Sequence, residues 1–265
     1  MKIFQIIDRE TGEVQGTLLY AEKDKAFIVE LAETLDEWSA PLLFSGFVKR
    51  GIYTVPRDIS LAWVRERIIP SGRQNISDIL ANQKMKEYDE QRFLEASEGR
   101  CSQDSLYIKR VNELPEYVAQ RQRHNLTGMF PASRNSLICF FSDDEVKRVN
   151  LEKLPDLEGI NKVLKNRELF ESVKVGFAGY FVTFDNAIDI PTAALYEAGE
   201  SLPLTKEDFV SFVRNNVLDT TEACGLLECS RQNLAYLGSQ KKLSPIKEGP
   251  SGNLYLKEDL LRTRW

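Results

Sequence analysis

Apolar and polar side chains alternate along the N-terminal segment in three short runs separated by polar turns. The runs are KIFQII, VQGTLLYA and AFIVEL (residues 2–7, 14–21 and 26–31), and the turns between them are DRETGE and EKDK. A period of two places successive side chains on opposite faces of a sheet, and short turns containing Gly or Asp join antiparallel neighbours. The pattern therefore predicts a three-stranded antiparallel meander.

A helical period replaces this alternation further along the chain. One predicted helix stops at Gly51, and its apolar face holds Trp38, Leu42, Phe44, Phe47 and Val48. We expect Trp38, Phe44 and Phe47 to lie in the core. Two more helices are predicted over residues 59–68 and 76–88, and a helix, a turn and a strand complete residues 1–113. We interpret this region as an N-terminal α+β interaction domain.

The centre of the chain divides into three segments by composition. Residues 114–131 are polar and rich in turn-forming residues, which predicts a linker. Residues 132–200 contain two pairs of alternating strands around a charged helical stretch, the pattern of a small α+β domain. Residues 201–217 predict a linker helix, in which Thr205 and Asp208 have the spacing of an N-terminal capping box.

The last segment, residues 218–265, has the pattern of a helix-turn-helix. It predicts two short helices, TTEACGLL and RQNLAYL, the first capped by Thr220 or Thr221 and the second by Ser230. Ala223 is the small residue that lets the two helices cross closely. The stretches KLSPIKE and NLYLK, joined by a Gly-Pro-Ser-Gly turn, predict a hairpin that would form a wing, and a last helix begins at EDLL. The predicted fold class is α+β, with an N-terminal meander and helices, a small middle domain and a C-terminal winged helix-turn-helix.

The polar face of the second helix carries side chains that suit DNA. Arg can donate twice to guanine, and Gln or Asn can pair with adenine, each pair discriminating by about 1–3 kcal/mol. Lysines around the helix would contact phosphates, which gives affinity and salt dependence without sequence choice. The predicted DNA-binding residues are Ser230, Arg231, Gln232, Asn233, Tyr236, Lys241, Lys242, Lys247, Ser251 and Asn253.

The stretches TTEACGLLECSRQNLAYL, KKLSPI, NLY and KEDLL resemble the excisionase-like and MerR-type winged helix-turn-helix family. The resemblance covers residues 218–265 and implies double-stranded DNA as the partner. The family often has Gly in the turn, where this chain has Glu228. A left-handed residue other than Gly costs roughly 1 kcal/mol, so we expect a slightly different turn.

The middle segment resembles a small bacterial α+β domain family of unknown function whose members are often linked to helix-turn-helix proteins and toxin–antitoxin genes. Asp144 stands where that family usually has Gly, and Phe184 where Trp is common. The resemblance implies a regulatory setting and no particular chemistry. It rests on Phe141, Ser142, Asp143, Glu145, Arg148, Leu151, Phe170, Val173, Gly179, Asp189, Leu195 and Tyr196.

Composition and charge narrow the function classes. The net charge is −5, yet residues 218–265 carry seven Lys or Arg against six Asp or Glu, so the acidity lies mostly in the first 217 residues. No stretch approaches the roughly 20 apolar residues of a membrane helix, and no leader pattern opens the chain, so we expect a cytoplasmic protein with no membrane contact. Four cysteines without a C-x2-C pair and a single histidine argue against a zinc site or a disulfide framework.

The sequence gives little support for an enzyme. Asp143, Asp144 and Glu145 are ligand types for a hard cation, and Glu145 with Lys147 matches an E-x-K pattern, but acids at a hairpin turn are more often solvated. We expect no enzyme, no catalytic residue, no metal and no cofactor.

Two hypotheses remain. The first is a DNA-binding transcriptional regulator, one form of which is an antitoxin-type repressor of its own operon. It would act as a homodimer, because a module of this size offers little surface for tight specific binding. The alternative is an interaction protein that sequesters a toxin or phage factor through residues 1–200 and uses the helix-turn-helix as a scaffold.

Overall fold

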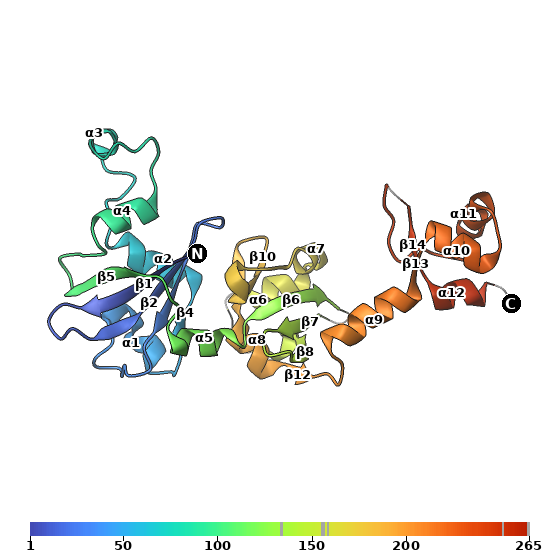
Figure 1. Ribbon diagram of the computed structural model, residues 1–265, viewed down its shortest axis with the longest axis horizontal. Coiled ribbons are helices and arrows are strands. Elements are labelled where there is room, and N and C mark those ends of the chain that lie inside the picture. Colours follow the sequence, from blue (N-terminus) through green and yellow to red (C-terminus); the bar gives the residue numbers. More distant parts are fainter. Residues whose placement is uncertain (133–134, 155–156, 158, 251, 264–265) are drawn as a thin grey trace. The chain divides into compact units, whose positions relative to one another are not determined.

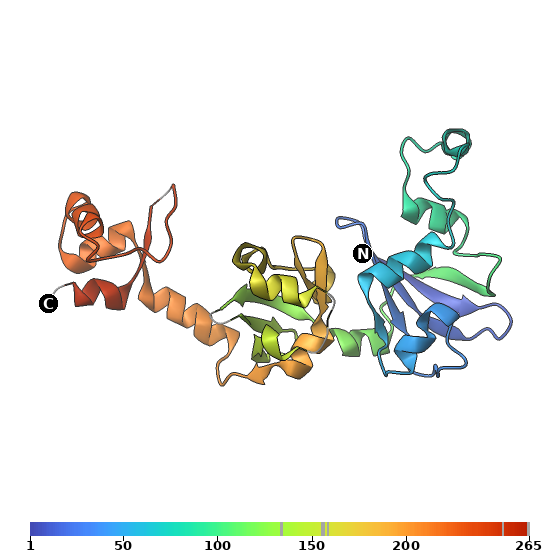
Figure 2. The same cartoon turned by 180° about the vertical axis from the view of Figure 1, so that it is seen from behind.

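The computed structural model describes residues 1–132, 135–154, 157, 159–250 and 252–263, and the fold is α+β. The chain divides into two compact units, one formed by residues 1–143 and 149–199 and the other by residues 144–148 and 200–265. Figures 1 and 2 show the elements of both units from opposite sides.

The first unit begins with an antiparallel sheet in the order β4-β3-β2-β1-β5. The predicted meander is confirmed as its three central strands, β1 (Lys2–Asp8), β2 (Val14–Ala21) and β3 (Ala26–Leu31). The edges are β4 (Thr54–Val55), which pairs with β3, and β5 (Leu106–Val111), which pairs with β1.

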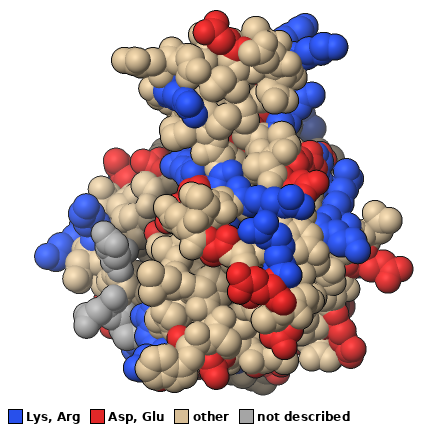
Figure 3. Space-filling view, turned by 90° about the vertical axis from the view of Figure 1, so that its left-hand side faces the viewer, with Lys and Arg blue, Asp and Glu red and all other residues tan. Residues whose placement is uncertain are grey.

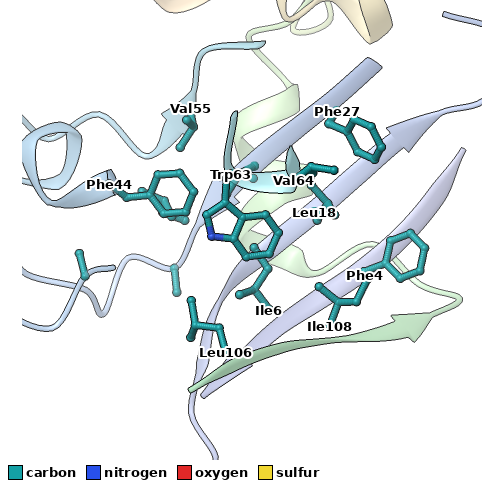
Figure 4. Packing of buried hydrophobic residues seen from close by; sticks show 14 of the residues in the cluster. Phe4, Ile6, Leu18, Phe27, Phe44, Val55, Trp63, Val64, Leu106 and Ile108 are labelled. Carbon is teal, nitrogen blue, oxygen red and sulfur yellow. The ribbon is translucent and has the colours of Figure 1, made fainter. Parts of the chain in front are cut away.

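Four helices accompany this sheet, and two of them cover one of its faces. In Figure 4, Trp63 of α2 and Phe44 of α1 lie over Ile6 and Leu18 of the strands. Trp63 is 1% exposed, so this cluster excludes water from the centre of the fold. Helix α3 has no buried residue and extends away from the sheet in both ribbon views. The helices are α1 (Leu42–Val48), α2 (Arg57–Arg65), α3 (Ile76–Asn82) and α4 (Glu90–Ala96).

The prediction that Trp38 is a core residue is wrong, because Trp38 is 86% exposed. Helix α1 begins only after Pro41, and the preceding residues form a turn around Asp36. The Asp36 carboxylate accepts hydrogen bonds from the backbone N–H groups of Trp38 and Ser39. An Asp that bonds the backbone just ahead favours a turn over a helix, and this removes Trp38 from the predicted apolar face.

The predicted linker, residues 114–131, is instead structured. It holds helix α5 (Glu116–Gln122) and strand β6 (Leu126–Pro131), and β6 pairs with β7 (Ser136–Phe141). Val118 of α5 joins Leu19 and Ile28 of the first sheet in a buried cluster that also takes in Tyr180 and Phe181. The buried positions could not be predicted from the composition of this segment, which is polar on average. Only one face of α5 is apolar, and β7, the strand that pairs with β6, lies after the segment in the sequence.

The rest of the first unit surrounds a second core that includes Phe170, Phe184 and Leu195. Strand β10 pairs with β9 on one side and β11 on the other. Gly179 has φ +75°, and a Cβ on it would lie 2.1 Å from the Leu126 carbonyl oxygen, so only Gly fits there. The remaining elements are α6 (Ile160–Lys165), α7 (Arg167–Glu171), β9 (Lys174–Val175), β10 (Phe181–Phe184), β11 (Ile188–Pro191) and α8 (Thr192–Ala198), with 3₁₀ turns at Leu151–Lys153 and Phe177–Gly179.

The second unit contains the C-terminal helices. Strand β8 (Val146–Asn150), which contributes residues 146–148 to this unit, pairs with β12 (Glu200–Ser201). The predicted capping box of α9 (Lys206–Asn216) is confirmed, with Thr205 and Asp208 each bonding the other's backbone N–H. Asp144, which stands where the resembled family has Gly, adopts a left-handed φ of 67°. The unit ends with β13 (Val217–Asp219), α10 (Thr220–Leu227), α11 (Arg231–Ser239), β14 (Leu254–Leu256) and α12 (Lys257–Arg262).

Candidate nucleic-acid interface

Helix α10 begins at a cap that the sequence interpretation missed. Asp219, not Thr220 or Thr221, is the N-cap residue, and its carboxylate accepts hydrogen bonds from the N–H groups of Thr221 and Glu222. Glu222 accepts a bond from the Asp219 N–H in return, which completes a capping box. Asp is as good a cap as Ser and better than Thr, so the residue one position earlier was the stronger candidate.

The turn between α10 and α11 is a Schellman motif. We expected Glu228 to alter the turn, but it adopts a left-handed φ of 52°, the conformation that favours Gly. The Cys229 N–H bonds the Cys224 carbonyl at 3.1 Å, and the Glu228 N–H bonds the Gly225 carbonyl at 3.3 Å. These bonds satisfy carbonyls at the end of α10 and redirect the chain sharply. The turn therefore ends one helix and starts the next within three residues, Glu228 to Ser230.

Helix α11 presents its polar face as predicted. The Ser230 hydroxyl caps it by accepting a bond from the Asn233 N–H at 3.2 Å, and Leu234, 2% exposed, points into the core of the module. Gln232 and Asn233 are exposed, and Tyr236 is 59% exposed. The buried residues that fix α11 in place are Ala223, Leu234, Leu243, Tyr255 and Leu260.

The segment predicted as a wing differs in its strand pairing. β14 pairs with β13 over three residue pairs. Across the predicted hairpin, the described residues form an isolated bridge between Lys247 and Leu254 and a hydrogen bond from the Ile246 N–H to the Leu254 carbonyl at 2.8 Å. The expected turn is present, because the Gly252 N–H bonds the Gly249 carbonyl at 3.0 Å. The Thr220 hydroxyl bonds the backbone N–H and carbonyl of Asn253, both at 3.2 Å, so the wing is tied to the start of α10. Ser251 lies outside the described residues.

Arg231 lies beside a groove between α10, the start of α11 and the wing. Its Nη2 donates to the Thr221 hydroxyl at 3.1 Å. The groove has a volume of about 360 Å³ and carries two cationic and two anionic side chains, Arg231, Lys247, Asp219 and Glu248. Asp219 is already engaged by the α10 cap, which directs its carboxylate at backbone N–H groups.

The three predicted phosphate-binding lysines are exposed. Lys241 follows α11 with a left-handed φ of 54°, Lys242 comes next, and Lys247 lies on the wing. None of the three forms an ion pair with a residue in the described part of the chain. Their ammonium groups are therefore available to an anionic partner. By contrast, Figure 3 shows a face on which cationic and anionic side chains intermingle.

The described residues contain no group of three or more His, Cys, Asp or Glu arranged to hold a metal ion. Asp143 instead accepts a hydrogen bond from the Tyr196 hydroxyl at 2.7 Å and lies 3.7 Å from Nε2 of His124. Over those residues, too, no helix has the length and apolar character needed to cross a membrane.

No protein-family model matches the chain, and neither the curated proteins nor the solved structures contain a significant match to it.

Proposed function

We propose that the protein is a transcriptional regulator that binds double-stranded DNA through residues 217–263. The observation that carries the proposal is the N-terminal end of α11, where Arg231, Gln232 and Asn233 follow a capped turn and are exposed. The first residues of the second helix are those that meet base edges when a helix-turn-helix enters the major groove.

The chemistry of this helix face supports sequence-selective binding. Gln232 and Asn233 each carry a side-chain amide, which can donate a hydrogen bond to N7 of adenine and accept one from its amino group. A guanidinium such as that of Arg231 can donate two hydrogen bonds to guanine. Among the described residues, the Arg231 guanidinium donates a hydrogen bond only to the Thr221 hydroxyl, a neutral group that a base edge can replace at small cost.

The surrounding lysines supply the sequence-independent part of the affinity. Each phosphate contact makes the slope of log affinity against log salt concentration more negative by about 0.9, so three lysine contacts give a slope of about −2.7. Lys241, Lys242 and Lys247 lie on two segments, the end of α11 and the wing, and can meet phosphates on either side of the helix.

The proposal includes a homodimer. A single module of this kind buries only about 600–1,000 Å² against DNA, which limits specific affinity. A second copy would add a second half-site and a palindromic operator. Control of its own operon by an antitoxin-type repressor is one setting that fits this arrangement.

A second candidate function rests on the surface of the first unit. Trp38 is 86% exposed and Leu42 is 93% exposed, and large apolar side chains of this kind commonly anchor protein–protein contacts. They support the alternative of a protein that sequesters a partner through residues 1–200. Trp38→Ser would abolish capture of that partner while leaving DNA binding intact.

Paired substitutions test the DNA proposal. Gln232→Ala should lower the preference for the specific site over unrelated DNA by about 5- to 150-fold, the equivalent of 1–3 kcal/mol. Gln240→Ala, at the far end of α11, is the matched control. Lys247→Ala should weaken binding to all sequences and reduce the salt slope by about 0.9, whereas Lys257→Ala on α12 should leave the slope unchanged. Equal behaviour of each variant and its control would refute the assignment of this face.

A further inference from the structure

Two of the four cysteines meet at the turn of the helix-turn-helix. Cys224 and Cys229 are both free thiols of intermediate exposure, and both pack on the edge of the module's core. Their backbones are joined by the hydrogen bond from the Cys229 N–H to the Cys224 carbonyl. In a Schellman motif the residues at these two positions commonly place their side chains in contact. In this chain both positions hold thiols.

We propose that Cys224 and Cys229 are a reversible dithiol–disulfide site. A disulfide requires Cα atoms about 4.4–6.8 Å apart and Cβ atoms about 3.8 Å apart, and residues in side-chain contact across this motif can satisfy both requirements without unfolding α10. The site is built by the left-handed Glu228, which folds Cys229 back on the last turn of α10.

A low-molecular-weight disulfide such as oxidised glutathione is the oxidant. One protein thiolate attacks a sulfur of this disulfide, forms a mixed disulfide and releases one small thiol. The second protein thiolate then attacks the bound protein sulfur and releases the other small thiol. In balance, two protein thiols become one disulfide and the oxidant becomes two thiols. Burial, and then the neighbouring Cys224 thiol, raise the pKa of Cys229 and so lower its share of thiolate.

The consequence for DNA rests on the proposed function. An S–S bond is about 2.0 Å long, well below the separation of two thiols in van der Waals contact, so closure tightens the turn. Arg231 begins α11 two residues after Cys229 and must shift with it. Oxidation should weaken specific DNA binding by about fivefold or more, the equivalent of 1 kcal/mol.

Peptide mapping of the full-length protein tests the site. The reduced protein is incubated in oxidised glutathione, alkylated after unfolding and cleaved with trypsin, which releases residues 215–231 with both cysteines. If the disulfide forms, this peptide carries no alkyl group, and its mass is that of the reduced peptide less two hydrogens. Cys139, 0% exposed and with its pKa raised by burial to about 12, is the internal control and should be alkylated.

Several results would overturn the proposal: two alkyl groups on this peptide, glutathione on each cysteine, or a disulfide between two chains. Cys224→Ser and Cys229→Ser should each stop at the mixed disulfide or remain reduced. DNA binding is measured in parallel with reduced and oxidised protein. If reduced protein fails to bind DNA, the proposed function fails while the peptide result still decides the dithiol site. Equal binding by both forms would overturn the regulatory consequence alone.

Discussion

The buried ion pair between Arg121 and Glu30 provides a prediction whose size follows from the structure. Glu30 of β3 is fully buried, and its Oε2 accepts hydrogen bonds from Nη1 of Arg121 at 2.9 Å and from the Thr54 hydroxyl at 2.8 Å. Arg121 also donates to the Leu31 carbonyl and lies 5.1–5.2 Å from two tyrosine rings. Helix α5 therefore supplies the positive charge that pairs with the buried carboxylate of Glu30 on strand β3. Arg121→Met removes that charge and keeps much of the apolar stem.

The cost of the change is limited by the protonation of Glu30. Burial raises the pKa of Glu30 above its ordinary value of 4.5, and the bonds from Arg121 and Thr54 oppose the rise. Without Arg121 the carboxyl can become neutral at a cost of about 1.36 kcal/mol for each pH unit above 4.5, which is about 3.4 kcal/mol at pH 7 and about 0.7 kcal/mol at pH 5. The lost bond to Leu31 adds about 1 kcal/mol at both pH values.

The direction of the pH dependence follows from the proton count. A carboxyl with a raised pKa binds protons more readily in the folded state, so its contribution to stability is largest below pH 4.5 and is lost as the pH rises through the raised value. Because the pKa of Glu30 is already raised with Arg121 present, Arg121→Met should lose at most about 4 kcal/mol at pH 7 and at most about 2 kcal/mol at pH 5.

Urea unfolding at the two pH values, followed by the fluorescence of buried Trp63, measures these differences in the first unit. Arg123→Met is the matched control, because Arg123 caps the same helix, is exposed and forms no ion pair with any described residue. The control should change stability by less than about 0.5 kcal/mol. The reasoning would be refuted if both variants were equally stable at pH 7, or if the loss in Arg121→Met were independent of pH.

Two further predictions concern the stability of the C-terminal module. Leu234→Ala removes a side chain that is 2% exposed and should destabilise the module by about 2–5 kcal/mol, seen as loss of helical circular dichroism at lower urea, whereas exposed Ala235→Ser on the same helix should not. Glu228→Gly relieves a left-handed conformation and should stabilise the module by about 0.5–1 kcal/mol in thermal unfolding; a decrease would contradict the left-handed turn.

Local sequence patterns were sufficient to predict those structural features whose determining residues lie close together in the sequence. The meander follows from alternation and short turns, the α9 box from Thr205 and Asp208, and the start of α11 from Ser230. Each of these features depends on residues within one turn or one hairpin of each other, so the pattern and the cause lie in the same window of sequence.

Other features depend on contacts that a local pattern does not contain. Strand β14 follows the wing turn, yet it pairs mainly with β13, which lies before α10. Arg67 is 4% exposed, because its guanidinium lies 3.8 Å from the Trp63 ring and bonds Asp104, 37 residues further along the chain. The proximity of Cys224 and Cys229 is likewise absent from any local pattern, since it depends on the backbone conformation of Glu228.

Binding of the full-length protein to the DNA upstream of its own gene, titrated at two salt concentrations with unrelated DNA as competitor, tests the central claim most directly. The account predicts site-preferring binding that weakens as salt rises, with the slope reduced by about 0.9 in Lys247→Ala and the site preference lost in Gln232→Ala. Binding that is absent, or that is insensitive to salt and to both substitutions, would contradict the account.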